Sequence, residues 1–282
     1  MTPAGIAIAI AIGRFATGEA NSEPVPVPAP TLFLSAFPTE SRLARPLFAS
    51  GPTEITLQFD AASAGSENEL VRRQRIAIAG DGRLVTTATG YPVASDKPVR
   101  QHTRPSFLID YDQPVFKGVL AQARAELGAK PSADDVTAFV DRFITKKGMA
   151  RGYDIASVVA ARHEGDCTEH AVLLTALARS FKLPARVASG IVMVEVHGKP
   201  MSFGHAWAEI YRDRRWEPAD AAFRGREPRV YLPLELLSDE GPGYGLAMMK
   251  NAAGSLGVRR VIVAEPAGVT RPSPTPPPRA TP

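Results

Sequence analysis

The chain is poor in cysteine, with one residue of this type, Cys167, among 282. A single thiol excludes a disulfide within the chain and excludes a zinc site built from several thiolates of one chain. Charge is also modest: the net charge is +4, and no run of Lys or Arg is longer than two. Nucleic-acid-binding proteins usually carry a concentrated basic patch, so the scattered basic residues argue against a nucleic-acid partner.

Long apolar runs are missing as well. The run from Ile6 to Ile12 is much shorter than the about 20 residues that cross a bilayer, so no integral membrane span is expected. Its length suits a secretory signal, although the usual basic residues ahead of it are absent, and alternating Ile and Ala also fit a strand. The Pro-rich stretch 24–30 is typical of a linker and favours the signal. We expect a periplasmic or otherwise exported protein, with the cytoplasm as the alternative.

What is present is the composition of a soluble globular protein, with 44% hydrophobic and 22% charged residues. Alternation predicts strands over 55–59, 75–79 and 83–89, the last two joined by a turn at Gly80-Asp81-Gly82. Helical spacing predicts helices over 116–127, 133–144, 155–161 and 167–181, and further strands follow over 185–196, 205–211 and 261–263. Helices followed by an antiparallel meander indicate an α+β fold.

Three polar side chains stand out along this pattern. Cys167 opens an apolar helix after Gly165-Asp166, His205 lies in a later strand, and Asp220 follows Trp216. A thiol has a pKa near 8.5, and a position at the first turn of a helix favours the thiolate. An imidazole can accept the thiol proton and return it to a leaving group, while a carboxylate orients the ring. The order therefore predicts a nucleophile, a base and an orienting group: Cys167, His205 and Asp220.

Other interpretations of the same residues remain open. A lone cysteine is often a small buried hydrophobic residue, but the polar neighbours of Cys167 argue against that here. His163 and His170 flank the cysteine in the pattern His-x3-Cys-x2-His, which could bind a metal. A helix that begins at Cys167 would leave His163 upstream in irregular chain. We expect no metal site.

Several segments together resemble the transglutaminase-like superfamily. They are Gly165-Asp166-Cys167-Thr168-Glu169-His170-Ala171, Ala178 to Val187, Gly204-His205-Ala206-Trp207-Ala208-Glu209, Trp216 and Asp220, within about 155–222. The resemblance implies a papain-like core, in which a Cys-bearing helix packs on an antiparallel sheet, and a triad at Cys167, His205 and Asp220. Bacterial members are largely cysteine proteases or amide-handling enzymes, often exported, with a separate β domain in front. Members commonly have Pro and a small hydroxyl residue after the triad Asp, whereas Ala221-Ala222 follow here.

The composition, the strand and helix patterns and this resemblance together divide the chain into five parts. We expect an apolar segment with a Pro-rich linker (1–30), a β-rich accessory domain (31–110), a transglutaminase-like catalytic core (111–240), a C-terminal extension (241–265) and a disordered Pro-rich tail (266–282).

The predicted activity is hydrolysis of an amide or peptide bond through a thioester, as in a thiol protease or amidase. The alternatives are a transamidating cross-linker and a non-catalytic binding module of the same fold. The backbone amide of Cys167 is the first candidate for oxyanion stabilisation. The expected partners are a peptide or protein substrate and a cell-envelope component. No cofactor is expected, because the mechanism needs none and calcium lacks a recognisable loop.

Overall fold

The computed structural model describes residues 36–60, 68–88, 90–94, 96–148, 154–225, 229–237 and 257–266. Two compact units make up the chain, 1–30 and 31–282, and all described residues belong to the second. The predicted apolar segment and linker (1–30) lie outside the described residues, as does nearly all of the predicted Pro-rich tail. The proposed division into five parts therefore stays a prediction.

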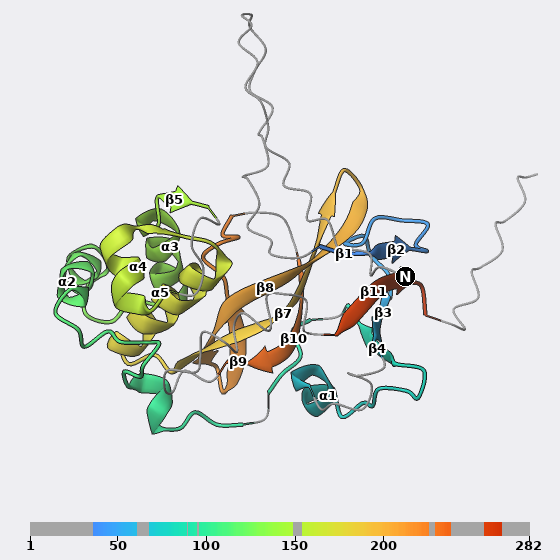
Figure 1. Ribbon diagram of the computed structural model, residues 1–282, viewed down its shortest axis with the longest axis horizontal. Helices are drawn as coiled ribbons and strands as arrows, with labels where there is room; N and C mark the ends of the chain where they lie inside the picture. The colour runs from blue at the N-terminus through green and yellow to red at the C-terminus, as the bar shows by residue number, and fades with distance from the viewer. Residues whose placement is uncertain are drawn as a thin grey trace, which may run out of the picture. The chain divides into compact units, whose positions relative to one another are not determined.

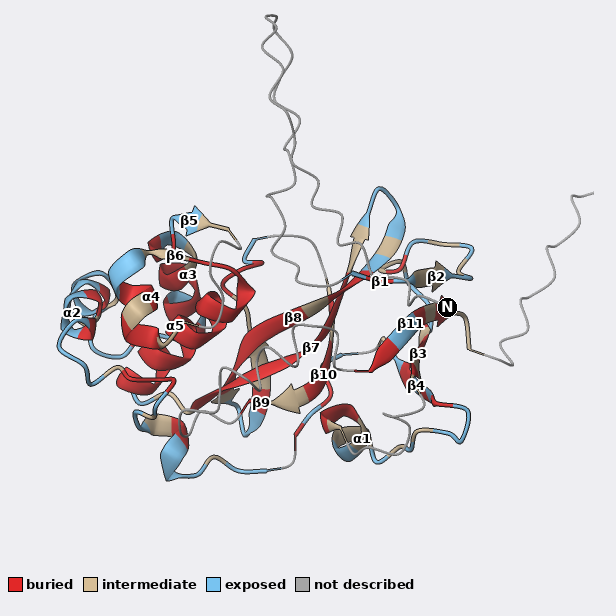
Figure 2. Ribbon diagram, in the orientation of Figure 1, coloured by how far each residue is buried: buried red, intermediate tan, exposed pale blue. Residues whose placement is uncertain are grey.

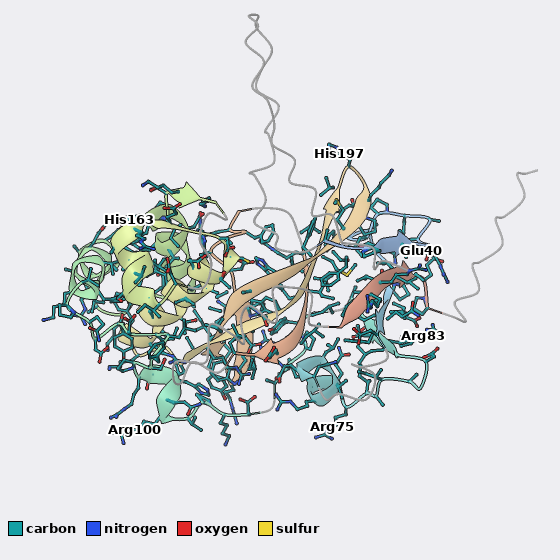
Figure 3. The ribbon with its side chains drawn as sticks, viewed as in Figure 1. Glu40, Arg75, Arg83, Arg100, His163 and His197 are labelled. Atoms are coloured by element: carbon teal, nitrogen blue, oxygen red, sulfur yellow. The ribbon has the colours of Figure 1, made fainter. Side chains whose placement is uncertain are left out.

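The central element is helix α5 (Cys167–Ser180), in which every residue is buried. It packs on strands β7 (Ala185–Val196) and β8 (Lys199–Arg212), which form a long antiparallel hairpin. His197 and Gly198 have φ angles of 50° and 74°, as a two-residue hairpin turn requires, and His197 is labelled at the hairpin tip in Figure 3. The predicted Cys-bearing helix on an antiparallel sheet is thus confirmed (Figure 1).

The sheet is completed by three further strands. β10 (Val230–Leu236) pairs with β7, while β1 (Ala36–Phe37) and β9 (Arg215–Ala219) both pair with β8. On the strand β8, Ala206, Ala208 and Ile210 face α5 and share its apolar core. Because side chains alternate along a strand, His205, Trp207 and Glu209 lie on the opposite face. Burial of both faces is visible in Figure 2, where β7 and β8 are largely red.

Three predicted helices form a cluster with α5 (Figure 1): two of them pack on α5, and the outermost packs on those two. They are α2 (Phe116–Leu127), α3 (Ala133–Phe143) and α4 (Ala156–Arg162). α3 starts where the sequence predicts, because the Ser132 hydroxyl accepts a hydrogen bond from the Asp135 amide and the Asp135 carboxylate accepts one in return. Two short parallel strands, β5 (Lys146–Lys147) and β6 (Glu164–Gly165), join the chain ahead of α4 to the residues just before Cys167.

A second sheet combines the front of the chain with its C-terminal part. Its strand order is β2 (Thr39–Ser41), β11 (Val258–Ala264), β3 (Glu54–Phe59) and β4 (Arg83–Thr87). The strand predicted at 261–263 therefore lies inside the front sheet. Side chains of this sheet share an apolar core with Ile191 and Met193 of β7.

The predicted strand over 75–79 is wrong, whereas the predicted turn at Gly80-Asp81-Gly82 and a strand from Arg83 to Thr87 are present. Residues 69–74 form helix α1 (Glu69–Gln74), capped by the Asn68 side chain, and Arg75 ends it with a left-handed φ of 53°. Residues 76–79 are not a strand, and β4 pairs with β3 instead. Ile76 and Ile78 pack on the apolar core beneath the front sheet. Their alternation therefore reflects burial at a loop and not strand pairing. A short 3-10 helix, η1 (Arg100–Thr103), follows in the connection to α2.

Among the described residues, no helix is both long and apolar enough to span a bilayer.

Candidate active site

Cys167 is the first residue of α5, and its surroundings fix where that helix begins. The Asp166 carboxylate accepts the amide of Thr168 at 2.8 Å, and Glu169 accepts the amide of Asp166 at 2.9 Å. These two bonds form a capping box that satisfies amides at the helix start. Only glycine fits at position 165, because a Cβ there would lie 2.2 Å from the Cβ of Glu169. The capping box and the close packing at Gly165 therefore fix the start of α5, and Cys167 is its first residue.

The thiol meets strand β8 at a gap in strand pairing. On the outer edge of β8, β1 pairs with residues 202–203 and β9 with residues 208–212. In the described part of the chain, no strand pairs with residues 204–207 on that edge. The backbone amide of Ala206 instead donates to the sulfur of Cys167. Cys167 is therefore held against the residue that directly follows His205.

His205 and Asp220 are hydrogen-bonded, as the proposed triad requires. The distance from Nε2 of His205 to Oδ2 of Asp220 is 2.9 Å, and their side chains are 0% and 5% exposed. Binding of Nε2 to the carboxylate leaves Nδ1 on the opposite side of the ring. Asp220 follows β9, so the β8–β9 hairpin brings it back to the strand that carries His205.

The Asp220 carboxylate is held at both oxygens. Oδ1 accepts the amides of Ala222 at 3.0 Å and Phe223 at 3.2 Å, and Oδ2 also accepts the hydroxyl of Tyr231 at 2.6 Å. Burial raises the pKa of Asp220, but attraction to His205 and the bonds from His205 and Tyr231 hold the pKa below its ordinary value. Asp220 is therefore an anion. The departure at Ala221-Ala222 leaves this loop with an ordered turn around the carboxylate.

Cys167 is in a different electrostatic state from the one that the helix start predicts. Its exposure is 1%, and burial raises the pKa of the thiol well above its ordinary value. The negative charge of Asp166 raises the pKa further, whereas the amide of Ala206 lowers it. In this structure the thiol is neutral, because burial and nearby carboxylates outweigh the favourable field of the helix end.

The residues of the alternative metal pattern have other partners. Nδ1 of His163 lies 3.3 Å from the carbonyl oxygen of Phe143, and the two rings stack with centroids 4.0 Å apart; Figure 3 labels His163 among the helices. His170 is buried within α5, and its Nδ1 lies 2.6 Å from the Asp166 carbonyl oxygen. Within the described ranges, no group of three or more His, Cys, Asp or Glu side chains could hold a metal ion.

A buried polar network lies on the same face of β8 as His205. Glu209, which is 0% exposed, accepts Arg73 at 2.6 Å and Arg186 at 2.7 Å. Tyr91 also donates to Glu209, and the indole of Trp207 donates to the Tyr91 hydroxyl at 3.0 Å. Two buried guanidinium groups thus compensate one buried carboxylate. The network links α1 and the connection before η1 to the strand of His205.

Tyr231 and the Glu209 network are absent from the sequence predictions. Tyr231 lies in an apolar strand 11 residues beyond Asp220, and the sequence around it carries no chemical signal. Arg73 is 136 positions from Glu209. Contacts over such separations leave no local pattern, so only the three-dimensional structure could find them.

Comparison with known proteins gives one family match and several solved structures with low sequence identity. Residues 121–221 match the transglutaminase-like superfamily. No curated protein matches the sequence. Among solved structures, a candidate cysteine protease from Cytophaga hutchinsonii has 16% sequence identity and a TM-score of 0.36 over 62% of this chain and 72% of that chain. The ethylmercury-bound periplasmic domain of TgpA from Pseudomonas aeruginosa has 16% identity and a TM-score of 0.37 over 62% and 73% of the two chains.

A second structure of that TgpA domain has 13% identity and a TM-score of 0.36 over 78% of this chain and 79% of that chain. The match over residues 121–221 confirms the resemblance that the motifs carry to the transglutaminase-like superfamily.

Proposed function

We propose that the protein is a cysteine enzyme that acts on an amide or peptide bond, with Cys167 as the nucleophile, His205 as the base and Asp220 as the orienting group. One observation carries the proposal. A buried histidine is hydrogen-bonded to a buried carboxylate, and the amide next to that histidine donates to the sulfur of Cys167. Covalent catalysis requires a nucleophile, a base and an orienting group close together, and these observations supply the base–orienter pair and place the sulfur at the residue next to the base.

The neutral thiol defines the first step. Nδ1 of His205 takes the proton of Cys167, and the Ala206 amide and the start of α5 stabilise the resulting thiolate. The sulfur then bonds to the substrate carbonyl carbon, with the backbone amide of Cys167 as a donor to the developing oxyanion. The carbon–nitrogen bond breaks, and the amine leaves with the proton held by His205. A thioester remains on Cys167.

Hydrolysis completes the cycle in the reaction we favour. His205 takes a proton from water as the water oxygen attacks the thioester carbon, and the carbon–sulfur bond breaks to release the acid. The sulfur recovers the proton from His205. A second amine in place of water would give transamidation, and the choice depends on how well the site excludes water. We favour hydrolysis because no motif in the sequence marks a binding site for a second amine. No step uses a metal or an organic cofactor.

The decisive experiment compares the protein with Cys167→Ala on a library of peptides and carboxamides, read by mass spectrometry. The protein should give cleaved or transamidated products that the variant does not give. Equal product from both would remove the catalytic proposal and leave the non-catalytic binding module. Iodoacetamide labelling at pH 6 is an independent check on the one thiol present, because a buried, neutral thiol should react readily only if His205 takes its proton. Complete labelling in denaturant is the control for reagent quality.

We also propose that the protein acts outside the cytoplasm on a peptide or protein substrate of the cell envelope. The support is the short apolar run and the Pro-rich stretch near the N-terminus. Fractionation of cells that express the full chain tests the location. Recovery in the cytoplasmic fraction alone would refute it.

A further inference from the structure

The hydroxyl of Tyr231 shares one carboxylate oxygen with His205. It lies 2.6 Å from Oδ2 of Asp220, and Nε2 of His205 lies 2.9 Å from the same atom. The other oxygen of Asp220 is bound by backbone amides of the following turn. Oδ1 is held by backbone amides, whereas Oδ2 is held by the side chains of His205 and Tyr231. The direction in which Oδ2 points therefore depends on these two side-chain donors.

Strand β10 brings Tyr231 to this position by an unusually close approach to β7. Tyr231 is paired with Val192, and Gly190 lies opposite Pro233. A Cβ on Gly190 would lie 2.1 Å from the carbonyl oxygen of Leu232, so only glycine permits the two backbones to pack this closely. The register of β10 shifts between Pro233 and Glu235, directly after this contact.

The ring of Tyr231 is fixed by its neighbours. Its centroid lies 5.0 Å from that of Trp207 and 6.4 Å from those of Tyr91 and His205. Trp207 is itself fixed by its hydrogen bond to Tyr91. Burial and the negative charge of Asp220 both raise the pKa of the phenol, so it remains a donor. An ordered ring with a permanent donor can hold a carboxylate in one orientation.

We propose that Tyr231 is a positioning residue that orients Asp220 toward His205 and acts on catalysis only through that carboxylate. This inference rests on the proposed function. Loss of the hydroxyl removes one of the two hydrogen bonds to Oδ2 that the described side chains make, so the orientation of the carboxylate is less tightly constrained. The His205 ring loses part of its alignment toward the sulfur.

The test uses Tyr231→Phe, with Tyr111→Phe as the matched control. Tyr111 is also half-buried, and its hydroxyl donates to the Thr103 carbonyl at 2.9 Å in the connection before α2. Loss of a hydrogen bond to a charged group should lower kcat of Y231F about tenfold with KM within about twofold. Y111F should keep kcat within about twofold of the parent.

A double-mutant cycle decides whether Tyr231 acts through Asp220. In an Asp220→Asn background, Y231F should change kcat by less than about twofold, because the oriented carboxylate is already gone. A tenfold further loss in that background would refute the proposal. Equal kcat for Y231F and Y111F would refute it as well.

A measurement that needs no activity separates this inference from the proposed function. In the Cys167→Ala protein, the NMR resonance of the His205 Nε2 proton reports its bond to Asp220. Y231F should shift or broaden that resonance, and Y111F should not. An unchanged resonance in Y231F refutes the positioning role. If the resonance changes but the protein has no hydrolytic activity, the proposed function is refuted and the positioning role of Tyr231 stands. If Y231F has a much lower Tm than Y111F, 3-fluorotyrosine at position 231 replaces it in the test. That residue keeps the ring and hydroxyl of tyrosine but changes the strength of the phenol as a donor, so the resonance should still shift.

Discussion

Glu169 is a carboxyl group buried one turn into α5, and its ionisation should destabilise the protein at high pH. Its exposure is 1%, and burial, with the negative charge of Asp166 next, raises its pKa from an ordinary 4.5 to about 8. Between these two values the folded state keeps a proton that the unfolded state releases. The folded state therefore binds more protons, and the free energy of unfolding falls as pH rises through this window.

The size of the effect follows from the two pKa values. One pKa unit corresponds to about 1.4 kcal/mol, so ionisation of Glu169 should cost the folded state about 4 kcal/mol more at pH 9 than at pH 5. Glu169→Gln removes the titration. It also loses one of the two accepting oxygens, which bind the amides of Asp166 and Asp154, at a cost of about 1 kcal/mol at every pH. The variant should match the parent near pH 5 and exceed it by about 4 kcal/mol at pH 9.

Urea unfolding followed by tryptophan fluorescence at pH 5, 7 and 9 measures these free energies, since both tryptophans, Trp207 and Trp216, are fully buried. Glu126→Gln is the control, because Glu126 is an exposed partner of Arg142 whose loss should change stability by less than about 1 kcal/mol at each pH. Parallel pH profiles for the parent and Glu169→Gln would show that the carboxyl does not titrate in this window, and the reasoning would fail.

Three further perturbations test other parts of the structure. Gly190→Ala should destabilise the protein by about 2 kcal/mol or more, because the backbone of β10 occupies the position of the new methyl group. Gly118→Ala, in open space on α2, should stabilise the protein by about 0.5–1 kcal/mol. Thermal unfolding compares the two variants, and equal Tm values would contradict the close approach of β10 to β7. Glu209→Gln should lower the free energy of unfolding by about 3–5 kcal/mol, because two buried guanidinium groups lose their counter-charge. Urea unfolding measures this loss, and a clearly smaller value would contradict the role of the network. Asp166→Asn keeps a helix cap but removes a negative charge beside Cys167, so iodoacetamide alkylation at pH 7 should become faster, and a slower reaction would disprove the electrostatic account.

The core of the fold could be predicted because its signals are local. The helix from Cys167 follows a recognisable cap, Asp166 with Glu169, and its predicted end at Phe181 differs by one residue from Ser180. The strand predicted over 185–196 coincides with β7. The pairing of His205 with Asp220 was expected from residue types and chain order, and the two side chains lie at hydrogen-bond distance. The catalytic roles of these residues remain proposals.

The front of the chain could not be predicted equally well. Residues 75–79 alternate like a strand, but Ile76 and Ile78 are apolar because they cover a core, and β4 pairs with a strand far ahead of the expected partner. The neutral state of Cys167 also escaped prediction. The dipole of a helix start is visible in the sequence, whereas the depth of burial and the nearby carboxylates depend on tertiary packing.

Strand β11 has a consequence for the order in which the protein is made. It lies between β2 and β3, although it is translated after every other described strand. Until residues 258–264 emerge, β3 presents an open edge that could pair with a neighbouring nascent chain. The helical core and its long hairpin are translated earlier, so they can fold while the front sheet waits for its last strand. Premature termination before Val258 should therefore yield aggregation-prone polypeptide with an otherwise complete core.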